Sequence, residues 1–496
     1  MRLKSLIESL DVGCPDLADF EVKGISCNSG QVSDNFIFVA IKGNKADGHE
    51  FIQEAIDRGA KAVIYQTPRH KDTLPVRQAG KTQENVNFIK VEDTRKALAR
   101  LSAEFYGNPS EKIKVVGITG TNGKTTVSYL IEAFLKETGK GFLPAVIGTV
   151  NYRFKDKEIP SINTTPGPIE LESLLADMLK EGAKYAIIEV SSHALDQCRT
   201  EGINFHSAVF TNLTQDHLDY HDNLENYFSV KARLFEGIGK NSFAIINNDD
   251  LYGRRLREMT KSKVITYGIE SPADMVARNI NFEIQRTEFS LVWLNKEVHI
   301  KTGLIGRHNV YNILAAASWA EGAGLDLSTV KSALEKFSSV PGRLERIDFK
   351  GSFSVFVDYA HTEDALRNVI GSLRGLSTNR IIVVFGCGGE RDKTKRPKMG
   401  CVVSELADYA IITSDNPRSE EPIKIIEDIK KGIRKENYCV IPDRKEAISK
   451  ALSLARAGDI VLVAGKGHEN YQISKNGRVR FDDREATREC LRSKNY

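Results

Sequence analysis

The chain of 496 residues lacks the features of a membrane-embedded or secreted protein. No segment approaches the run of about 18 apolar residues that a membrane span needs, so no transmembrane helix is expected. Residues 1–10 contain neither the apolar core of a signal peptide nor a small-residue cleavage site, so no secretory signal is visible. We therefore expect a cytoplasmic protein with no membrane span.

Patterned cysteines and a strong excess of one charge are also missing. The cysteines are odd in number and contain no C-x-x-C pair, which argues against a disulfide framework or a zinc knuckle; the seven lie at positions 14, 27, 198, 387, 401, 439 and 490. We expect them to be reduced thiols. A net charge of +4 is too weak for a general nucleic-acid binder and is compatible with a phosphorylated small substrate. No nucleic-acid partner is expected.

The length and composition that are present predict several globular domains. A hydrophobic content of 41% with 27% charged residues can fill ordinary cores. At roughly 150 residues per domain the length predicts two to four domains, and three fit the sequence best. A helix expected over 94–106 stops at Gly107-Asn108-Pro109, and a further unit begins near Pro341-Gly342-Arg343. We therefore place the domains at 1–108, 109–340 and 341–496.

Apolar strands alternate with helical segments through most of the chain. This alternation predicts an α/β fold with a small N-terminal α/β domain, a central doubly wound sheet of the nucleotide-binding-loop type and a C-terminal Rossmann-like domain. The strands on which this prediction rests are expected at 35–41, 62–65, 115–119, 185–190, 208–213, 243–247, 264–267, 354–357, 381–385, 409–413 and 460–463.

The most informative motif is a Gly-rich loop that follows the strand at 115–119. Its sequence is Gly120-Thr121-Asn122-Gly123-Lys124-Thr125-Thr126, and a helical segment comes next. Such glycines let backbone N–H groups turn toward phosphates, Lys124 can reach the terminal phosphates and Thr125 can ligate Mg²⁺. Five residues, not the usual four, separate Gly117 from Gly123, which indicates a G-T-N-G-K-T variant. An incidental Gly-rich turn is the alternative, but strand, loop and helix occur in the required order.

Polar clusters follow several strands at their carboxyl ends, where ligands of open α/β sheets gather. Glu189 ends one strand and His217 follows the next. Both are plausible Mg²⁺ ligands beside Thr125, because a hard cation prefers oxygens and tolerates one imidazole. Each has a purely structural alternative. Lys231, on the helix that comes next, would by itself be interpreted as a solvated lysine.

Two further segments are suited to binding polar ligands. Asn163-Thr164-Thr165-Pro166 precedes a helix and offers hydroxyls and N-terminal N–H groups to an anion or amide, although an ordinary helix cap is an equal alternative. Asn309 and Asn312 are three apart on one predicted helical face, where their amides could contact a purine edge.

The third domain contributes three polar segments after its strands. Gly386 to Lys398 is a Gly-rich turn followed by a basic run, for which a nucleic-acid or localisation patch is the usual alternative. Its position directly after a strand favours an anionic ligand instead. Ser414-Asp415-Asn416-Pro417-Arg418 and Gly465-Lys466-Gly467-His468-Glu469 follow two other strands, and each by itself could be an ordinary turn.

Together these segments resemble the Mur ligase family, ATP-dependent amide-forming enzymes of peptidoglycan precursor synthesis. The similarity spans essentially the whole chain, through G-T-N-G-K-T-T (120–126), N-T-T-P (163–166), E-V-S-S-H-A-L (189–195), K-A-R-L-F (231–235), D-N-P-R (415–418) and G-K-G-H-E (465–469). It is strongest to members that add meso-diaminopimelate to a UDP-N-acetylmuramoyl dipeptide. It implies an acyl phosphate intermediate, ATP as co-substrate and Mg²⁺ as cofactor.

The resemblance also implies roles for individual residues. The expected catalytic residues are Lys124, Lys231, Glu189 and His217, with Lys231 carbamylated. The expected metal-binding residues are Thr125, Glu189, His217 and Lys231. The expected ATP-binding residues are Gly120, Thr121, Asn122, Gly123, Lys124, Thr125, Thr126, Asn309, Asn312, Arg343, Asp358 and His361.

Two further groups of residues are implied for the other substrates. The UDP-linked substrate is expected to contact Cys27, Ser29, Asn44, Lys45, Ala46, Asn163, Thr164, Thr165, Ser191, Gln197 and Arg199. Diaminopimelate is expected to contact Arg391, Asp415, Asn416, Pro417, Arg418, Gly465 and Glu469. The chain departs from the family in one place, since Asn28-Ser29-Gly30 stands where Asp-Ser-Arg is usual.

Two other hypotheses remain at this point. A folylpolyglutamate-synthase-like ligase would share the loop and the modified lysine, but D-N-P-R and N-T-T-P argue against it. A catalytically silent scaffold would keep only a nucleotide pocket, and the joint retention of Lys124, Glu189, His217 and Lys231 argues against that. Amine-dependent phosphate release from ATP would exclude the scaffold.

Overall fold

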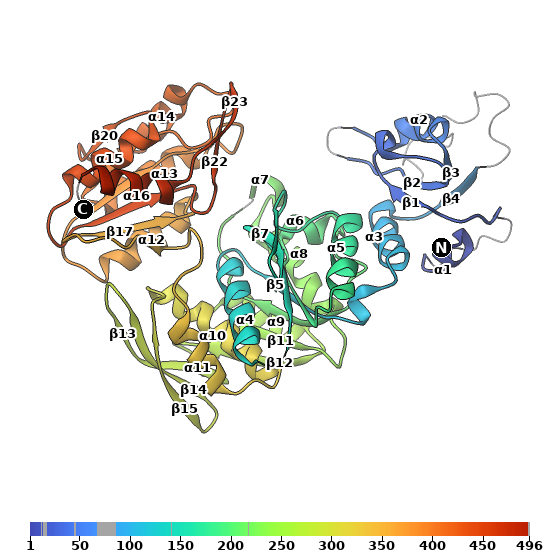
Figure 1. Cartoon of the computed structure of the whole chain (residues 1–496), viewed down its shortest axis with the longest axis horizontal. Helices are drawn as coiled ribbons and strands as arrows, with labels where there is room; N and C mark the ends of the chain where they lie inside the picture. The colour runs from blue at the N-terminus through green and yellow to red at the C-terminus, as the bar shows by residue number, and fades with distance from the viewer. Residues whose placement is uncertain are drawn as a thin grey trace. The chain divides into compact units, whose positions relative to one another are not determined.

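A computed structural model of the chain describes residues 1–10, 12, 17–43, 46–66, 86–139, 141–216 and 218–494. The chain contains two compact units. The first consists of Met1–Gly117, Phe142–Ser207 and Glu236–Ser242, and the second of Ile118–Gly141, Ala208–Phe235 and Phe243–Tyr496. Figure 1 shows sheets with helices packed along them in both the early and the late part of the chain.

The first unit begins with a four-stranded parallel sheet in the order β1-β2-β3-β4. Its strands are β1 (Gly24–Ser26), β2 (Phe36–Val39), β3 (Ala60–Tyr65) and β4 (Asn87–Lys90). Ile37 and Val39 of β2 share a core with α1 (Leu3–Glu8) and α3 (Thr94–Phe105), while Phe38 shares another with α2 (Ile52–Asp57). Alternate side chains thus bury both faces, as a parallel sheet requires. Two short 3-10 helices, η1 (Ser29–Gln31) and η2 (Gly48–Phe51), follow β1 and precede α2.

The rest of the first unit carries strands and helices of the predicted central domain. After η4 (Pro109–Glu111) and the start of β5 (Lys114–Thr119), β6 (Pro144–Ile147) pairs parallel with β9 (Tyr185–Glu189). The strands β7 (Asn151–Phe154) and β8 (Lys157–Pro160) continue from β6 as antiparallel hairpins. Between β8 and β9 the chain forms α5 (Pro168–Lys180), which packs against α3, and α6 (Ser192–Asp196) follows β9.

The second unit begins with the end of β5 and α4 (Lys124–Glu137), which packs against α10 (Arg307–Gly322) and α11 (Leu327–Lys336). Its strands run in the order β10-β11-β12-β13-β14-β15, where the pairs β11–β12 and β12–β13 are parallel and the pairs β13–β14 and β14–β15 are antiparallel. These strands are β10 (Phe205–Phe210), β11 (Phe243–Asn247), β12 (Lys263–Gly268), β13 (Met275–Phe282), β14 (Thr287–Trp293) and β15 (Lys296–Thr302). The helices between them are α7 (Leu218–His221), α8 (Leu224–Gly237) and α9 (Leu251–Met259).

The C-terminal part of the second unit is a six-stranded sheet in the order β16-β17-β21-β18-β19-β20. Apart from the short antiparallel β16, its strands pair parallel. They are β16 (Glu345–Arg346), β17 (Ser354–Asp358), β18 (Ile381–Phe385), β19 (Tyr409–Ile412), β20 (Tyr438–Val440) and β21 (Ile460–Ala464). The remaining elements are α12 (Glu363–Arg374), α13 (Lys395–Leu406), α14 (Pro422–Lys430), α15 (Arg444–Leu454), the hairpin β22 (Tyr471–Ser474) and β23 (Gly477–Arg480), and α16 (Asp483–Ser493).

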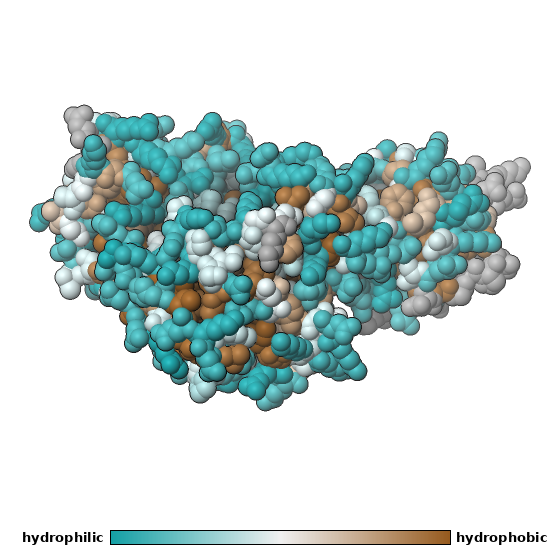
Figure 2. Space-filling view, turned by 60° about the horizontal axis from the view of Figure 1, so that its bottom comes forward, coloured by the Kyte–Doolittle hydropathy of each residue, from teal (hydrophilic) through white to brown (hydrophobic). Residues whose placement is uncertain are grey.

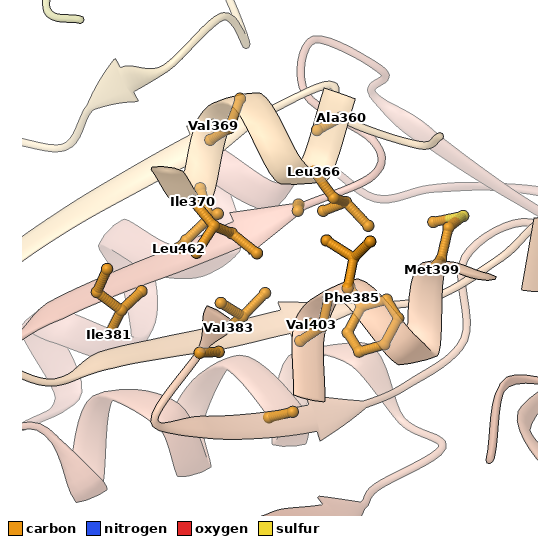
Figure 3. Close-up of a cluster of buried hydrophobic side chains, with 14 of the residues drawn as sticks. Ala360, Leu366, Val369, Ile370, Ile381, Val383, Phe385, Met399, Val403 and Leu462 are labelled. Carbon is orange, nitrogen blue, oxygen red and sulfur yellow. The ribbon is translucent and has the colours of Figure 1, made fainter. Parts of the chain in front are cut away.

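Alternation along β18 explains why this sheet is covered on both faces. Ile381, Val383 and Phe385 point into a core with α12, α13 and α14, of which Figure 3 shows a part. Ile382 and Val384 point into a second core, with α15 and α16. Because β21 lies between β17 and β18, the chain crosses over it, and the carboxyl ends of these strands form the crevice where ligands of such sheets bind.

The predicted α/β class with parallel-rich sheets is confirmed, while the boundaries 1–108, 109–340 and 341–496 stay a prediction. The predicted strands are present, with ends that shift by up to three residues. The hairpins β7–β8 and β13–β15 were not predicted from the sequence. In the described part of the chain, no helix is long and apolar enough to cross a membrane. The face shown in Figure 2 is mostly hydrophilic, with hydrophobic side chains in limited patches.

Candidate active site

The Gly-rich loop joins β5 to α4 with two glycines in the left-handed region. Gly120 has φ 146° and Gly123 has φ 91°. A Cβ on Gly120 would clash with Thr211 Oγ1, and one on Gly123 would clash with Asn312 Oδ1. Both positions therefore require glycine, for conformation and for space. The first turn of α4, which contains Thr125 and Thr126, presents N–H groups that have no partner within the helix.

The segment after β10 holds this loop in place. Asn212 accepts from Thr121 N through its carbonyl at 2.8 Å and from Asn122 N through Oδ1 at 3.0 Å. Lys124 Nζ donates to the carbonyl oxygens of Gly120 and Thr121, both at 2.8 Å. The lysine therefore curls over the loop that it follows. A phosphate bound there would meet this ammonium and the positive end of α4.

Lys231 lies buried beside the same loop. It is 1% exposed, and its Nζ donates to Gly120 O at 3.1 Å and lies 4.5 Å from the centre of the Tyr227 ring. Burial and the neighbouring Lys124 ammonium lower the pKa of Lys231 well below its ordinary value of 10.5, with Asp216 opposing the shift. The solvated-lysine interpretation is therefore wrong. The environment favours a neutral amine.

Three of the predicted ATP-binding residues, Arg343, Asp358 and His361, lie around β16 and β17. Arg343 Nη2 donates to Thr125 Oγ1 at 3.3 Å, so this arginine meets the first turn of α4. Its guanidinium also lies 4.6 Å from the centre of the Tyr359 ring. Asp358 accepts from Leu344 N at 2.6 Å, and burial raises the pKa of this carboxyl. His361 Nδ1 contacts Tyr359 O at 2.8 Å.

The two predicted asparagines of α10 do share one helical face. Asn312 Nδ2 donates to Asn309 Oδ1 at 3.1 Å, and Asn309 Nδ2 donates to Ile305 O at 2.8 Å. Both side chains are buried, and Asn312 faces Gly123 of the loop. The structure thus brings these amides to the Gly-rich loop, and their contact with a purine stays a prediction.

In the first unit, the N-T-T-P loop, the end of β9 and the segment after α6 meet in one hydrogen-bonded cluster. Thr165 Oγ1 donates to Glu189 O at 2.7 Å and accepts from Ser191 N at 3.1 Å. Arg199 Nη1 donates to Thr165 O at 2.7 Å, and its Nε and Nη2 donate to Gln197 Oε1. Four of the predicted substrate residues, Thr165, Ser191, Gln197 and Arg199, thus lie in one cluster. Asn163, two residues before Thr165 in the loop, accepts from Tyr152 OH at 2.6 Å through its carbonyl.

The carboxylate of Glu189 is held by a residue that sequence reasoning missed. Thr149 donates to Glu189 Oε1 from its backbone N at 3.1 Å and to Oε2 from its hydroxyl at 2.8 Å. The same hydroxyl lies 3.1 Å from Thr164 Oγ1. Thr149 therefore joins the expected metal carboxylate to the expected substrate loop. Its place just after β6 was the available signal, because strand ends gather functional residues.

The predicted uridine-side residues lie near β1 and before η2. Ser29 is buried and its Oγ donates to Glu54 Oε2 at 2.8 Å, while Cys27 is exposed. Asn28 Oδ1 accepts from Gly30 N at 3.0 Å and so caps η1, the local role that an aspartate could also fill. Ala46 accepts from Gly43 N through its carbonyl. Asn44, Lys45 and His217 lie outside the described residues.

Two predicted diaminopimelate residues, Asn416 after β19 and Glu469 after β21, converge on a buried lysine. Lys466 Nζ donates to Asn416 Oδ1 at 3.1 Å and to Glu469 Oε2 at 3.0 Å, and Asn416 Nδ2 donates to the same Glu469 oxygen at 2.8 Å. Lys466 is fully buried. It orients the amide of Asn416 and offsets the charge of Glu469. Lys466 stands within the quoted G-K-G-H-E motif, yet it was not among the predicted site residues.

Arg418 lies beside this cluster in the left-handed region, with φ 55°. Its backbone N donates to Ile473 O at 3.0 Å, and its Nη1 donates to Gly389 O at 2.7 Å. A carboxylate ligand would therefore meet the other nitrogens of the fork. Gly465 has φ 119°, and a Cβ there would lie 2.8 Å from Asp415 Oδ2.

The last two predicted residues flank the Gly-rich turn after β18. Arg391, which follows Gly388, Gly389 and Glu390 of this turn, is exposed. The carbonyl of Pro417 faces Gly389 so closely that no Cβ would fit between them. The structure thus gathers most of the predicted diaminopimelate residues at the carboxyl ends of β18, β19 and β21.

Comparison with known proteins assigns the chain to a family. Three family models match it in order: "Mur ligase family, catalytic domain" over residues 21–106, "Mur ligase middle domain" over 118–320, and "Mur ligase, glutamate ligase domain" over 342–467. The chain belongs to the Mur ligase family. The Gly-rich loop thus lies within the match to the middle domain, and Asn416 and Lys466 lie within the match to the glutamate ligase domain.

Two curated relatives that match this Mur ligase over its full length carry the same name. It is 44% identical to UDP-N-acetylmuramoyl-L-alanyl-D-glutamate--2,6-diaminopimelate ligase of Solibacter usitatus over 100% of this chain and 99% of the relative. It is 42% identical to ligase 1 of that name from Clostridium acetobutylicum over 99% of each. A solved structure of the same title has a TM-score of 0.70 at 33% identity and covers 99% of both chains. Folylpolyglutamate synthase of Mycobacterium tuberculosis complexed with ADP shares the fold alone, with 18% identity, a TM-score of 0.63, and coverage of 76% of this chain and 92% of that chain.

Proposed function

We propose that this Mur ligase adds meso-diaminopimelate to UDP-N-acetylmuramoyl-L-alanyl-D-glutamate, in an ATP-dependent step of peptidoglycan precursor synthesis. Similarity of 44% and 42% across the full chain to proteins of that name supports the proposal. The observation that carries it is that a guanidinium and a carboxylate both contact Asn416. Arg418 Nη1 lies 3.4 Å from Asn416 O, and Glu469 accepts from Asn416 Nδ2. A site with a guanidinium and a carboxylate so placed suits an amino acid centre that carries both charges.

The reaction begins with phosphoryl transfer at the Gly-rich loop. The D-glutamyl carboxylate attacks the γ-phosphorus of ATP. The bond from this phosphorus to the oxygen of the β-phosphate breaks, ADP leaves, and an acyl phosphate is formed. The amine of diaminopimelate then attacks the acyl carbon, loses a proton, and expels phosphate as the amide forms. Lys124 and the N-terminus of α4 stabilise the charge that builds on the transferred group.

Mg²⁺ is the expected cofactor, and the first turn of α4 offers it one ligand, the hydroxyl of Thr125. In the first unit, Glu189 offers a carboxylate that Thr149 holds in place. Within the described part of the chain, no cluster of three or more His, Cys, Asp or Glu could hold a metal by itself. Mg²⁺ does not need such a cluster, because it keeps several waters and binds through one or two carboxylates and the substrate phosphates. When bound, it offsets the charge of the phosphates during transfer.

Lys231 is proposed to carry a carbamate. A neutral lysine amine adds to CO₂ with loss of one proton, and the product is an anionic carboxylate on nitrogen. The buried position and lowered pKa of Lys231 favour the neutral amine that this addition needs. The modification would place an anion next to the ammonium of Lys124. That change brings opposite charges together and creates an oxygen ligand beside the loop.

Each proposed domain is assigned one substrate. Residues 1–108 would bind the UDP portion, residues 109–340 ATP, and residues 341–496 the amino acid. The order and ranges of the three matching family models support this division.

Phosphate release tests the proposal. Purified protein with ATP, Mg²⁺ and the UDP-linked dipeptide is assayed with meso-diaminopimelate, with L-lysine, or with no amine. We expect release that depends on the amine and is at least about a hundredfold more efficient with diaminopimelate, because lysine leaves a cation unpaired. Release that ignores the amine would contradict ligation, and a preference for lysine would contradict the assigned substrate.

A further inference from the structure

One side chain of the basic run 391–398 is buried. Arg396, in α13, is 1% exposed, whereas the neighbouring Lys393 side chain is 68% exposed. The sequence left open whether this run forms a nucleic-acid or localisation patch. Burial removes Arg396 from any such surface, so its charge must have an internal partner.

Arg396 and Glu420 together hold the Gly-rich turn that follows β18. Arg396 Nη2 donates to Gly388 O at 3.3 Å and to Glu420 Oε1 at 2.9 Å, and its Nη1 donates to Glu420 Oε2 at 3.0 Å. Glu420 Oε1 also accepts from the backbone N of Glu390 at 2.6 Å. The pair therefore binds backbone groups on both sides of Gly389. A bidentate arginine–carboxylate pair fixes orientation as well as distance.

Gly389 is the point where this turn meets Arg418. Its carbonyl accepts from Arg418 Nη1 at 2.7 Å, and its N donates to Asn416 O at 2.9 Å. The turn packs so tightly that a Cβ on Gly389 would clash with Pro417 O. A shift of the Gly389 peptide would therefore move the guanidinium of Arg418.

The geometry points to Arg396 and Glu420 as positioning residues that fix the guanidinium of Arg418 and thereby set the selectivity for diaminopimelate over lysine. They act through the backbone of Gly388, Gly389 and Glu390. This inference rests on the proposed function, because it concerns the site assigned there to the amino acid. The Arg396 guanidinium and the Glu390 N–H lower the pKa of Glu420 to about 2, so the pair stays charged near neutral pH.

The structure supplies a matched control for Glu420. Asp428 Oδ2 accepts from the same Arg396 Nη1 at 3.0 Å, and Asp428 Oδ1 pairs with Lys431 at 2.5 Å. This carboxylate joins α13 to the end of α14, whereas Glu420 joins α13 to the turn. Glu420→Gln and Asp428→Asn therefore each remove one negative charge from Arg396, but only the first weakens the hold on Glu390 N.

The experiment compares Glu420→Gln, Asp428→Asn and Arg396→Lys with the wild type in the full-length enzyme. The readouts are kcat and KM for meso-diaminopimelate, the KM for ATP, kcat/KM for L-lysine, and Tm. We expect Glu420→Gln to raise the KM for diaminopimelate about tenfold, near 1.4 kcal/mol, and to lower the selectivity over lysine, with the KM for ATP unchanged. Arg396→Lys keeps the charge but loses the fork and should shift the same way. Asp428→Asn should leave KM and selectivity unchanged.

Equal effects of Glu420→Gln and Asp428→Asn on KM would overturn the inference, as would lower Tm and kcat with unchanged selectivity. If Glu420→Gln does not fold, Arg396→Lys against Asp428→Asn makes the same comparison, and unchanged selectivity in Arg396→Lys overturns the inference. A wild type that shows no diaminopimelate-dependent phosphate release would instead contradict the proposed function.

Discussion

The ammonium of Lys124 is the single charge that the nucleotide chemistry needs most. It donates hydrogen bonds to two carbonyl oxygens of the loop, and it can exchange these for bonds to phosphate oxygens when ATP binds. We predict that Lys124→Ala lowers kcat/KM by about a hundredfold or more, since leaving buried charge unpaired costs roughly 3–5 kcal/mol. Lys136→Ala, at the exposed end of the same helix, is the control and should remain active. A folded Lys124→Ala with near wild-type turnover would contradict the role.

Lys231 differs from an ordinary helix lysine in burial and in pKa. We predict that the native protein carries one added CO₂ at this residue, that Lys231→Ala is nearly inactive, and that a small added carboxylate partly restores activity. Removing CO₂ from the buffer should lower the activity of the wild type. The carbamate loses CO₂ reversibly, and it forms again only when CO₂ from solution adds to the neutral amine that burial favours. Native mass analysis that finds an unmodified Lys231 in a fully active enzyme would show this wrong.

Arg418 is the cation to which selectivity is assigned. Lysine lacks the second carboxylate of diaminopimelate and would leave the guanidinium without its partner. We predict that Arg418→Ala loses most activity with meso-diaminopimelate without making lysine a good substrate, because Glu469 and Lys466 stay in place. The measurement is kcat/KM for both amines. A value for diaminopimelate within about threefold of the wild type, far below the loss that such a pair implies, would remove Arg418 from the site.

At the scale of elements, α5 carries a buried carboxyl where it packs against α3. Glu172 is 2% exposed, Oε2 has no hydrogen-bond partner in the described part of the structure, and its Oε1 lies 3.2 Å from where a Cβ on Gly202 would be. Burial raises the pKa of Glu172 from 4.5 to about 8. The folded state therefore binds more protons than the unfolded state between those values, so this group makes folding less favourable as pH rises.

Glu172→Gln tests that pH dependence. The variant cannot ionise, so its Tm should exceed that of the wild type by an amount that grows between about pH 5 and pH 8 and then levels off. The gain is on the order of a few kcal/mol at most, at about 1.4 kcal/mol per pH unit. A Tm difference that is independent of pH would mean that Glu172 does not stay protonated in the folded protein.

Some elements were predictable from the sequence and others were not, for physical reasons. Buried parallel strands such as β5 and β18 are continuous apolar runs, which distinguish them from their surroundings. The β13–β15 hairpins alternate polar and apolar residues, and β8 is exposed throughout, so they give weaker signals. The positions of the Gly-rich loop and the strand-end clusters followed from strand order. The burial of Lys466 and the pairing of Arg396 with Glu420 could not be predicted in this way, because burial of a charged side chain depends on partners distant in sequence.

For the whole molecule, the α/β class and the family followed from the motifs taken jointly. Family membership is confirmed by three matching models and by relatives 42–44% identical across the full chain. The contacts that join Thr165 to Ser191 and Lys466 to Asn416 show why motifs far apart in sequence belong to common clusters. The sequence could not supply their distances or their hydrogen-bond partners. Those distances and partners depend on how the chain connects the strands of each sheet, which brings residues distant in sequence to the same strand ends.

The central claim is that one enzyme forms an amide through an acyl phosphate and uses diaminopimelate. It is tested most directly by labelling the D-glutamyl carboxylate of the UDP-linked dipeptide with ¹⁸O and analysing both products by mass spectrometry. The account predicts one tripeptide and one ADP per turnover, with one ¹⁸O atom in each phosphate released, because the acyl oxygen leaves with phosphorus. Tripeptide formed without ¹⁸O in the phosphate, or phosphate released without tripeptide, would contradict it.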